Sequence, residues 1–537
     1  MDKKSKFYQN EYFLIILIII LAYILRILPY LFGYHLPLTE DSMIEYQQIL
    51  YLIKNNAINV NNQYALFPVL HILIYGLYSI GFNSYHTFML LPPLIASCGL
   101  IFFYLFLRKY FDKKVSLISC LVIATFGFHI HWSSQSVRET LGLFFFPLLI
   151  YLFDNFIKKK SISSLFILLI SYLIFIATHA WSNLMYLIFI FLWIVYQKMN
   201  KSDLILSILL YTVFLSTTIL YWLFFYTNIF VVYHIKNIFI TIPVGILSIL
   251  FIIFLKLIYP KKLNNRYFLL ILSLFLIIGA ILSSFITSFR YPIHQLIILI
   301  ILFILGLLGY KYQKNENSTK FFKIVLSSSI ILILFLAFMY LTFKFTGKSQ
   351  FIVDPLRMIE FIIYPYSIFI SYGILNILKR YKFNKKTFYV ILTVSLIISG
   401  ILFYPSIFIF HSKFENTPIY DIRNDVRYIS PETINLIDYA NKNGYEVISI
   451  RYIVNTYQKT FYKDKENIAA LFTSEDKNIL KYYNLVNDEA KGVINPKDPY
   501  EYIKNLPILY KNNDGKLYIL DINKDSLKKF YKRYNAK

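Results

Sequence analysis

The fold is decided by an unbroken apolar stretch near the start of the chain, Phe13–Phe32, which reads FLIILIIILAYILRILPYLF. About 20 apolar residues are the length that a helix needs to cross the hydrocarbon core of a bilayer. Similar runs recur along most of the sequence. They are continuously apolar and do not alternate with polar residues, which excludes the strands of a membrane β-barrel. The sequence therefore predicts a polytopic, all-α membrane protein.

The composition supports this interpretation. The chain has 537 residues, of which 58% are hydrophobic and 15% charged, and its mean hydropathy is +0.56. A soluble domain carries about 25% charged residues, so a cytosolic enzyme, a disordered chain and a small disulfide scaffold are excluded. The two cysteines, Cys98 and Cys120, both lie in apolar runs, and no disulfide framework is expected.

The net charge of +25 belongs mostly to short loops. The chain up to Phe410 carries +21, and the remainder carries +4. Clusters such as Arg108-Lys109 and Lys158-Lys159-Lys160 lie between apolar runs, and short basic loops mark the cytoplasmic side of a membrane protein. Nucleic-acid binding needs a basic face on a folded domain, so no nucleic-acid partner is expected.

Thirteen apolar runs are long enough to be read as transmembrane helices: Phe13–Phe32, Thr87–Leu107, Val115–Ile130, Thr140–Ile157, Ile162–Thr178, Trp181–Tyr196, Leu204–Tyr226, Ile238–Leu255, Phe268–Ile286, Leu296–Tyr310, Ile324–Phe343, Ile359–Leu378 and Thr387–Phe408. A fourteenth candidate, Tyr64–Ile80, is interrupted by Pro68 and His71. We interpret it as a helix that lies in the interface or re-enters the membrane.

The basic loops set the orientation. With the N-terminus inside, the cytoplasmic segments carry 25 Lys+Arg and the exterior loops carry 7, which is a strong positive-inside signal. The alternative counts Tyr64–Ile80 as a span and starts the chain outside, with a split of 23 to 9. The two topologies differ only in the side of the N-terminus and of the first loop.

The character of the chain changes after the last apolar run. Ser430-Pro431-Glu432 is typical of a helix start and Gly444 of a helix end. Glu446–Val454 is predicted to be a strand, and Pro507–Tyr510 and Lys516–Asp521 are predicted to form a hairpin. We therefore expect a transmembrane domain at residues 1–410, with a long first exterior loop at 33–86, and a small extracytoplasmic α/β domain at 411–537.

In this topology the exterior loops collect carboxylates, histidines and arginines at one membrane boundary. They are His35, Glu40, Asp41 and Glu45 in the first loop, His131, Arg138 and Glu139 in the second, His179 in the third, and His234, Arg290, His294, Asp354, Arg357 and Glu360 in later loops. The cytoplasmic loops offer mostly lysine, with no glycine-rich phosphate loop and no nucleotide fingerprint. A catalytic site is therefore expected outside.

Each of these residues also has an ordinary structural interpretation. Arg138-Glu139 could be an interfacial anchor or a local ion pair, and His179 could be hydrogen-bonded at a helix end. Arg26 lies inside the first span, where an arginine is costly and usually functional, although it could instead extend to the membrane surface.

Three features resemble the GT-C class of membrane glycosyltransferases. Arg26-Ile27-Leu28-Pro29-Tyr30 leads into a long exterior loop with Glu40-Asp41, and the second loop ends in Ser136-Val137-Arg138-Glu139-Thr140-Leu141-Gly142, similar to the acidic second-loop motif of that class. Thirteen spans followed by an exterior domain resemble the catalytic subunit of archaeal oligosaccharyltransferase. The tail lacks the Trp-Trp-Asp-Tyr-Gly motif, and the first loop lacks Asp-x-Asp. A relative that transfers a monosaccharide or glycan to another acceptor fits better.

The resemblance implies sugar transfer from a polyprenyl- or dolichyl-phosphate-linked donor to a glycan or protein acceptor, in the cell envelope. Asp41 is the expected base for the attacking hydroxyl, with Glu40 as its substitute. Positive charge for the phosphate could come from Arg26, Arg138, Arg290 or Arg357, and His179 is a further candidate for substrate binding. Asp41 and Glu139 could hold Mg²⁺ or Mn²⁺.

Two alternatives remain open at this stage. A flippase or transporter of lipid-linked glycans would need charges lining a path within the spans, and Arg26 is the clear intramembrane case. A glycan polymerase or ligase would share the exterior chemistry. In every case the protein is expected in the cell membrane as a multi-pass protein with its C-terminal domain outside.

Overall fold

The structure is a computed structural model, and it describes residues 11–31, 40–59, 66–222, 293–312, 316–325, 327–328, 359–380, 390, 392–397, 431–448, 467–473, 508–511 and 515–520. The chain divides into two compact units. The first comprises Met1–Leu36 and Gln48–Ile409, and the second comprises Pro37–Gln47 and Phe410–Lys537.

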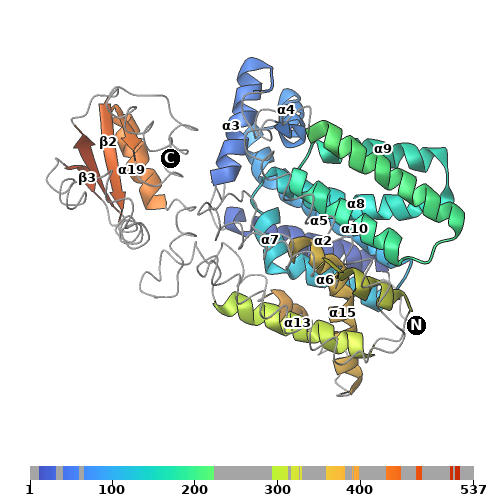
Figure 1. Cartoon of the computed structure of the whole chain (residues 1–537). Coiled ribbons are helices and arrows are strands. Elements are labelled where there is room, and N and C mark those ends of the chain that lie inside the picture. Colours follow the sequence, from blue (N-terminus) through green and yellow to red (C-terminus); the bar gives the residue numbers. More distant parts are fainter. Residues whose placement is uncertain are drawn as a thin grey trace, which may run out of the picture. The chain divides into compact units, whose positions relative to one another are not determined.

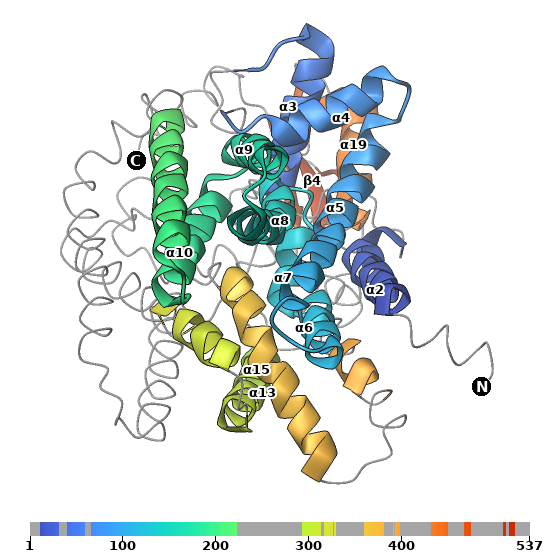
Figure 2. The ribbon, with the colours of Figure 1, turned by 90° about the vertical axis from the view of Figure 1, so that its right-hand side faces the viewer.

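The first unit is helical throughout its described part (Figures 1 and 2). Its helices include α2 (Glu11–Leu31), α4 (Val69–Ser79), α5 (Ser84–Leu107), α6 (Lys113–Thr125), α7 (Gly127–Ser133), α8 (Arg138–Lys159), α9 (Ile162–Ile176), α10 (Ala180–Tyr196), the helix Lys201–Trp222, α13 (Ile293–Tyr312) and α15 (Ile359–Arg380). Helix α3 (Glu40–Asn55) begins in the second unit and ends in the first.

Membrane spans are recognised among the described residues by length and apolar composition. Five helices qualify, and α6 with α7 would make a sixth if the bent pair is one span. The predicted spans Ile238–Leu255 and Phe268–Ile286 lie outside the described residues. The count of thirteen spans therefore stays a prediction, whereas a multi-helix membrane architecture matches the apolar helices that are described.

One predicted span differs from expectation. The run Val115–Ile130 is not a straight helix, because α6 ends at Thr125 and α7 starts at Gly127 with a bend of 59° between them. Phe126, at the junction, has an extended backbone with φ −73° and ψ 117°. The apolar pattern continues through the break, so the break has no signature in hydropathy.

The long first loop contains two helices. Helix α3 starts at Glu40, and α4 starts directly after Pro68, which fits the fixed backbone angle of proline at a helix start. At 1.5 Å per residue, α4 with its 11 residues is about 16 Å long, roughly half of the bilayer core. This length fits our interpretation of Tyr64–Ile80 as a helix that does not cross.

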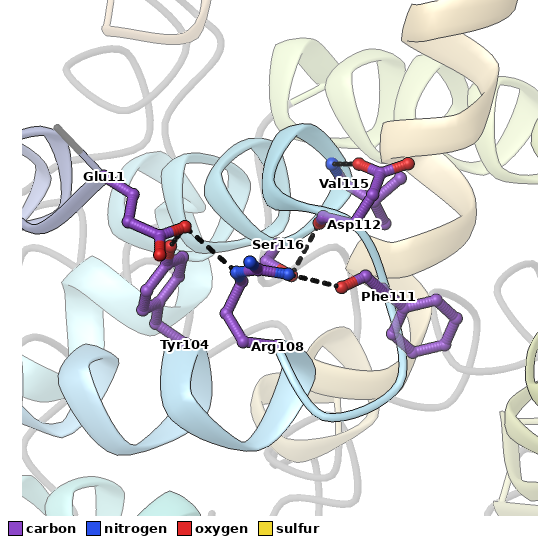
Figure 3. Close-up of polar contacts among 7 residues, drawn as sticks. All are labelled: Glu11, Tyr104, Arg108, Phe111, Asp112, Val115 and Ser116. Carbon is purple, nitrogen blue, oxygen red and sulfur yellow. Dashed lines mark hydrogen bonds and ion pairs between the residues drawn. The ribbon is translucent and has the colours of Figure 1, made fainter. Parts of the chain in front are cut away.

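The turn between α5 and α6 is tied to the start of α2 (Figure 3). Arg108 Nε lies 3.1 Å from Glu11 Oε2, which also accepts a hydrogen bond from the Tyr104 hydroxyl. Arg108 Nη1 donates to the carbonyl of Phe111, and Asp112 caps α6 by accepting from the backbone N–H of Val115. The predicted cytoplasmic loop is therefore a fixed turn.

A buried carboxylate, Asp154, lies near the C-terminal end of α8 and contacts this turn. Asp154 Oδ2 lies 2.8 Å from Lys109 Nζ and 3.3 Å from Lys158 Nζ, and Asp154 also accepts from the Tyr110 hydroxyl. Burial lowers the pKa of Lys109, and the charge of Asp154 opposes that shift. These contacts hold the basic loop against α8.

Helices α13 and α15 lie against each other (Figures 1 and 2), and glycines lie where their backbones come close. A Cβ on Gly309 would lie 1.8 Å from the carbonyl oxygen of Phe369, and a Cβ on Gly373 would lie 2.1 Å from that of Leu305. Small residues allow membrane helices to approach closely without a hydrophobic driving force. The glycines thus set the spacing of this helix pair.

The second unit contains α19 (Pro431–Lys442) and a four-stranded sheet in the order β1-β2-β4-β3. The strands are β1 (Tyr445–Ile448), β2 (Asn467–Thr473), β3 (Ile508–Lys511) and β4 (Gly515–Leu520). Strands β1 and β2 pair in parallel, and β4 pairs antiparallel with β2 and β3. Helix α19 contacts all four strands. The side of the membrane on which this unit lies stays a prediction.

The side of the first loop can be tested by cysteine labelling. Asn55 and Lys159 are both exposed, and the thirteen-span topology places Asn55 outside and Lys159 inside. A membrane-impermeant maleimide applied to intact cells should label an Asn55→Cys variant and leave Lys159→Cys unlabelled until the membrane is opened. Protection of Asn55→Cys in intact cells would support the fourteen-span alternative.

Candidate functional site

The buried guanidinium of Arg26 donates a hydrogen bond to a backbone carbonyl at the break between α6 and α7. Helix ends leave carbonyls without intrahelical partners. Arg26 Nη1 donates to the carbonyl oxygen of Ala124, near the end of α6, at 3.2 Å, and to Ala22 in its own helix at 2.7 Å. The Arg26 residue is 1% exposed. It therefore lies inside the protein and does not extend to the membrane surface.

A chain of hydrogen bonds continues from Arg26 across three further helices. Arg26 Nη2 lies 2.7 Å from His129 Nδ1 in α7, and His129 Nε2 lies 2.8 Å from the hydroxyl of Tyr364 in α15. The Tyr364 hydroxyl in turn donates to the carbonyl of Leu143 in α8 at 3.3 Å. All three side chains are buried.

The geometry fixes the direction of each bond. A guanidinium has donors only, so His129 Nδ1 must accept from Arg26. A neutral imidazole then carries its proton on Nε2 and donates it to Tyr364, whose own proton goes to Leu143. We call Arg26, His129 and Tyr364 the Arg-His-Tyr network.

The second exterior loop is shorter than predicted and is closed on itself. His131 to Ser133 belong to α7, and α8 starts at Arg138. The Thr140 hydroxyl accepts from the backbone N–H of Val137 at 3.3 Å and donates to the carbonyl of Trp132 at 3.2 Å. Ser136 has a φ of 53°, in the left-handed region that non-glycine residues seldom adopt. The loop Ser134–Val137 is therefore a compact, buried connection.

Glu139 and Arg138 open α8. Glu139 is 2% exposed in the first turn, where the positive end of the helix dipole favours a carboxylate. Arg138 is half-buried, with its guanidinium 5.2 Å from the ring centre of Phe67. The predicted phosphate-binding arginine and the predicted metal-binding acid are thus neighbours at a helix start.

His179 lies close to the same stretch of α8. It is the N-cap of α10, and its Nδ1 accepts from the backbone N–H of Ser182 at 3.3 Å. A Cβ on Gly142 would lie 2.2 Å from the Ser182 hydroxyl oxygen and 3.6 Å from His179 Cβ. Gly142 follows Glu139 by three residues, which is the spacing that puts two residues on one helix face. The structure therefore brings His179 to the Glu139 end of α8.

Gly142 permits this approach, and its substitution should disturb it. Gly142→Ala is expected to separate α8 from the start of α10, because the new methyl overlaps Ser182. The cost of such overpacking is typically about 1–3 kcal/mol. The double variant Gly142→Ala/Ser182→Gly removes the overlapping side chain and should recover most of the loss in the thermal unfolding midpoint. Equal midpoints for the single and double variants would contradict this packing.

Of the remaining predicted site residues, some lie among the described residues and others do not. Glu40 and Asp41 form the first residues of α3, and Asp41 is half-buried. Arg290 and Arg357 lie outside the described residues. Glu360 is fully buried in the first turn of α15, one turn before Tyr364.

Sequence reasoning missed His129 and Tyr364. Both lie inside apolar runs, and Tyr364 is one of 48 tyrosines. A signal was present in Arg26, because an arginine within a span needs acceptors from neighbouring helices. The sequence alone could not show which helices supply them.

The residues are a poor match to a metal site within the described part of the chain. No group of three or more His, Cys, Asp or Glu side chains there is close enough to hold an ion. Stable binding of Mg²⁺ or Mn²⁺ needs several oxygen ligands. No step of the chemistry below is therefore derived through a metal.

Comparison with known proteins gives a likeness of layout. No protein-family model matches the sequence, and no curated protein matches it either. Among solved structures, the archaeal oligosaccharyltransferase AglB from Archaeoglobus fulgidus, in complex with an inhibitory peptide and a dolichol-phosphate, has 13% identity and a TM-score of 0.49, covering 98% of this chain and 76% of that one.

A second solved structure is described as the oligosaccharyltransferase of the same organism in complex with zinc and sulfate. It has 12% identity and a TM-score of 0.42, covering 83% of this chain and 61% of that one. The chain is similar in layout to an archaeal oligosaccharyltransferase. Its activity has to be argued from its own residues.

Proposed function

We propose that the chain is a membrane glycosyltransferase that moves a sugar or glycan from a polyprenyl- or dolichyl-phosphate-linked donor to an acceptor on the extracytoplasmic face. The observation that supports it most is the start of α8. There Glu139 is buried beside Arg138, and Gly142 admits His179 one turn further on. A buried acid and a cation at the end of a membrane helix are costly and usually functional.

The proposed reaction is a single displacement at the anomeric carbon. The acceptor hydroxyl oxygen forms the new bond to this carbon, and the bond from the carbon to the phosphate oxygen breaks. The hydroxyl proton passes to Asp41, and the lipid phosphate leaves with the electron pair. Attack opposite the phosphate inverts the anomeric centre.

The arginines serve the leaving group in this proposal. A guanidinium can bind phosphate oxygens through two parallel N–H donors. This interaction is stronger in a low-dielectric setting than in water. Arg138 is the described candidate, and Arg290 and Arg357 are the others. Arg26 is less suited to this role, since its Nη atoms already donate to Ala22, Ala124 and His129.

The proposal assigns different roles to the transmembrane domain at residues 1–410 and to the domain at 411–537. The transmembrane domain supplies the reacting groups, in the cell membrane as a multi-pass protein. The domain at 411–537 lies outside in this proposal. Because it lacks the Trp-Trp-Asp-Tyr-Gly motif, it positions an acceptor or partner without supplying catalytic groups. The acceptor is a glycan or a protein. The expected Mg²⁺ or Mn²⁺ on Asp41 and Glu139 is left out of this proposal, because the described residues contain no group of three or more His, Cys, Asp or Glu side chains that could hold an ion.

The test has to separate transfer from flipping and from polymerisation. Purified protein in vesicles containing a polyprenyl-phosphate sugar should form a new glycosidic bond to an added acceptor, detected by mass spectrometry. Movement of intact donor between leaflets without bond formation would support a flippase. A requirement for a second lipid-linked glycan would support a polymerase or ligase.

Glu139→Gln is the sharpest variant for this assay. Glutamine keeps the size and one acceptor oxygen, replaces the other oxygen with an NH₂ donor and removes the charge, so folding should be retained. A carboxylate repels a phosphate, so the role proposed for Glu139 is to orient the neighbouring Arg138. Loss of its charge should lower turnover about 100-fold, as expected when a reacting group is slightly misplaced. Turnover within threefold of the unaltered protein would remove Glu139 from the site.

A further inference from the structure

We propose that the Arg-His-Tyr network is a positioning device, which holds α7 and the loop Ser134–Val137 so that Glu139 and Arg138 keep their places. The proposal rests on the proposed function for its catalytic consequence only. The structural consequence can be measured without any activity.

Each member of the network comes from a different helix. Arg26 is in α2, which leads into the loop with Glu40 and Asp41. His129 is in α7, and Tyr364 is in α15, one turn after Glu360. The last acceptor, Leu143, is in α8, one turn after Glu139. The network therefore joins α2, which precedes the first loop, α7 and α8, which flank the second loop, and α15, which carries Glu360.

Helix α7 depends on this network for its position. It has 7 residues, and isolated helices shorter than about 12 residues are marginal. It is separated from α6 by the bend, so the continuous helix does not hold it. Its buried side-chain hydrogen bonds to α2 and α15 are made by His129, which meets Arg26 on one side of the ring and Tyr364 on the other.

A displacement of α7 would reach the start of α8 directly. The carbonyl of Trp132, in α7, accepts from Thr140, which follows Glu139. The backbone N–H of Ser134 donates to Ile130 in α7 at 2.9 Å. The loop between the two helices is only four residues long, so it cannot absorb a large shift.

Tyr364→Phe tests the network with the smallest change. It removes one hydroxyl, keeps the ring in its aromatic contacts with Phe103 and Phe146, and leaves His129 Nε2–H without its acceptor. Tyr366→Phe is the matched control in the same helix. Its hydroxyl donates to the carbonyl of Phe303 in α13 at 2.6 Å, so the control loses one hydrogen bond between helices, away from the loop, whereas Tyr364→Phe loses two.

The measurement is the rate at which a small maleimide labels Ser134→Cys in the full-length protein in vesicles. Ser134 is 4% exposed, so labelling should be slow, and the chain with only Cys98 and Cys120 serves as the blank. Tyr364→Phe should increase the rate about tenfold or more, since each of the two buried hydrogen bonds that it removes can shift an equilibrium by up to about that factor. Tyr366→Phe should leave it unchanged. A probe at Gln135, 1% exposed, repeats the test.

Equal labelling rates in Tyr364→Phe and Tyr366→Phe would overturn the proposal, because a general loss of stability affects both variants alike. In the transfer assay, Tyr364→Phe should lower kcat and leave KM unchanged, as expected when reacting groups are misplaced. If no variant and no unaltered protein transfers sugar, the proposed function fails. The labelling comparison still decides whether the network positions the loop.

Discussion

Asp41→Asn is expected to lower glycosyl transfer by about 10²–10⁴-fold, the usual worth of general-base assistance. Asparagine keeps the size of the side chain, but it cannot take the proton of the attacking hydroxyl. Donor binding and folding should be retained. The measurement is turnover of the purified variant with a polyprenyl-phosphate sugar, together with its thermal unfolding midpoint.

Glu316→Gln is the control for this substitution. Glu316 is 63% exposed, and its carboxylate lies 2.6 Å from Lys198 Nζ in a loop that the predicted topology places in the cytoplasm. An exposed ion pair contributes little to stability, so turnover should be unchanged. Turnover of Asp41→Asn within threefold of the unaltered protein would contradict the base role. A silent Glu40→Gln as well would remove the first loop from the site.

Gly309→Ala is expected to have the largest effect on stability, lowering the free energy of unfolding by about 3 kcal/mol, the upper part of the range for overpacking. The added methyl would lie 1.8 Å from the carbonyl oxygen of Phe369 and 2.6 Å from the backbone nitrogen of Gly373. Both are backbone atoms, so no side-chain rotation relieves the overlap, and α13 must move away from α15.

Gly76→Ala is the matched control. Gly76 lies within α4, and a Cβ there would have nothing within 4 Å. Alanine favours helix over glycine by about 1 kcal/mol, so this variant should be as stable as the unaltered protein or more so. The check is thermal unfolding in detergent for both variants, and a similar midpoint for the two would show that α13 and α15 do not depend on their close approach.

The local parts of the fold could be predicted from the sequence. The apolar runs at Phe13–Phe32 and Thr87–Leu107 coincide with α2 and α5, because about 20 apolar residues in a row satisfy a bilayer in one way only. In the tail, α19 starts at Pro431, and Gly444 follows its end with a φ of 84°. The hairpin of β3 and β4 lies where turn residues separate two apolar stretches.

The long-range parts could not be predicted. His129 lies 103 residues from Arg26, and Tyr364 lies 235 residues from His129. Local periodicity carries no information about such pairs. The bend at Phe126 could not be predicted either, because apolar residues continue on both sides of it. The carbonyl of Ala124 at the bend accepts a hydrogen bond from Arg26, which is distant in the sequence.

The second loop shows most clearly which features could not be predicted from the sequence. The residues Arg138 and Glu139 were identified as a charged motif at the head of a span, and they do open α8. The burial of the loop before them was not predicted, because Ser134, Gln135 and Ser136 are polar residues that normally face water. Their burial depends on the packing of α7 and α8.

In the proposed function, a lipid phosphate, and not a nucleotide, carries the sugar that is transferred. Purified protein can be given the same sugar on a polyprenyl phosphate and, separately, on a nucleotide, with product followed by mass spectrometry. The account predicts a glycosylated acceptor from the lipid-linked sugar and none from the nucleotide sugar. Transfer from the nucleotide sugar, or no transfer from any polyprenyl-phosphate sugar, would contradict it.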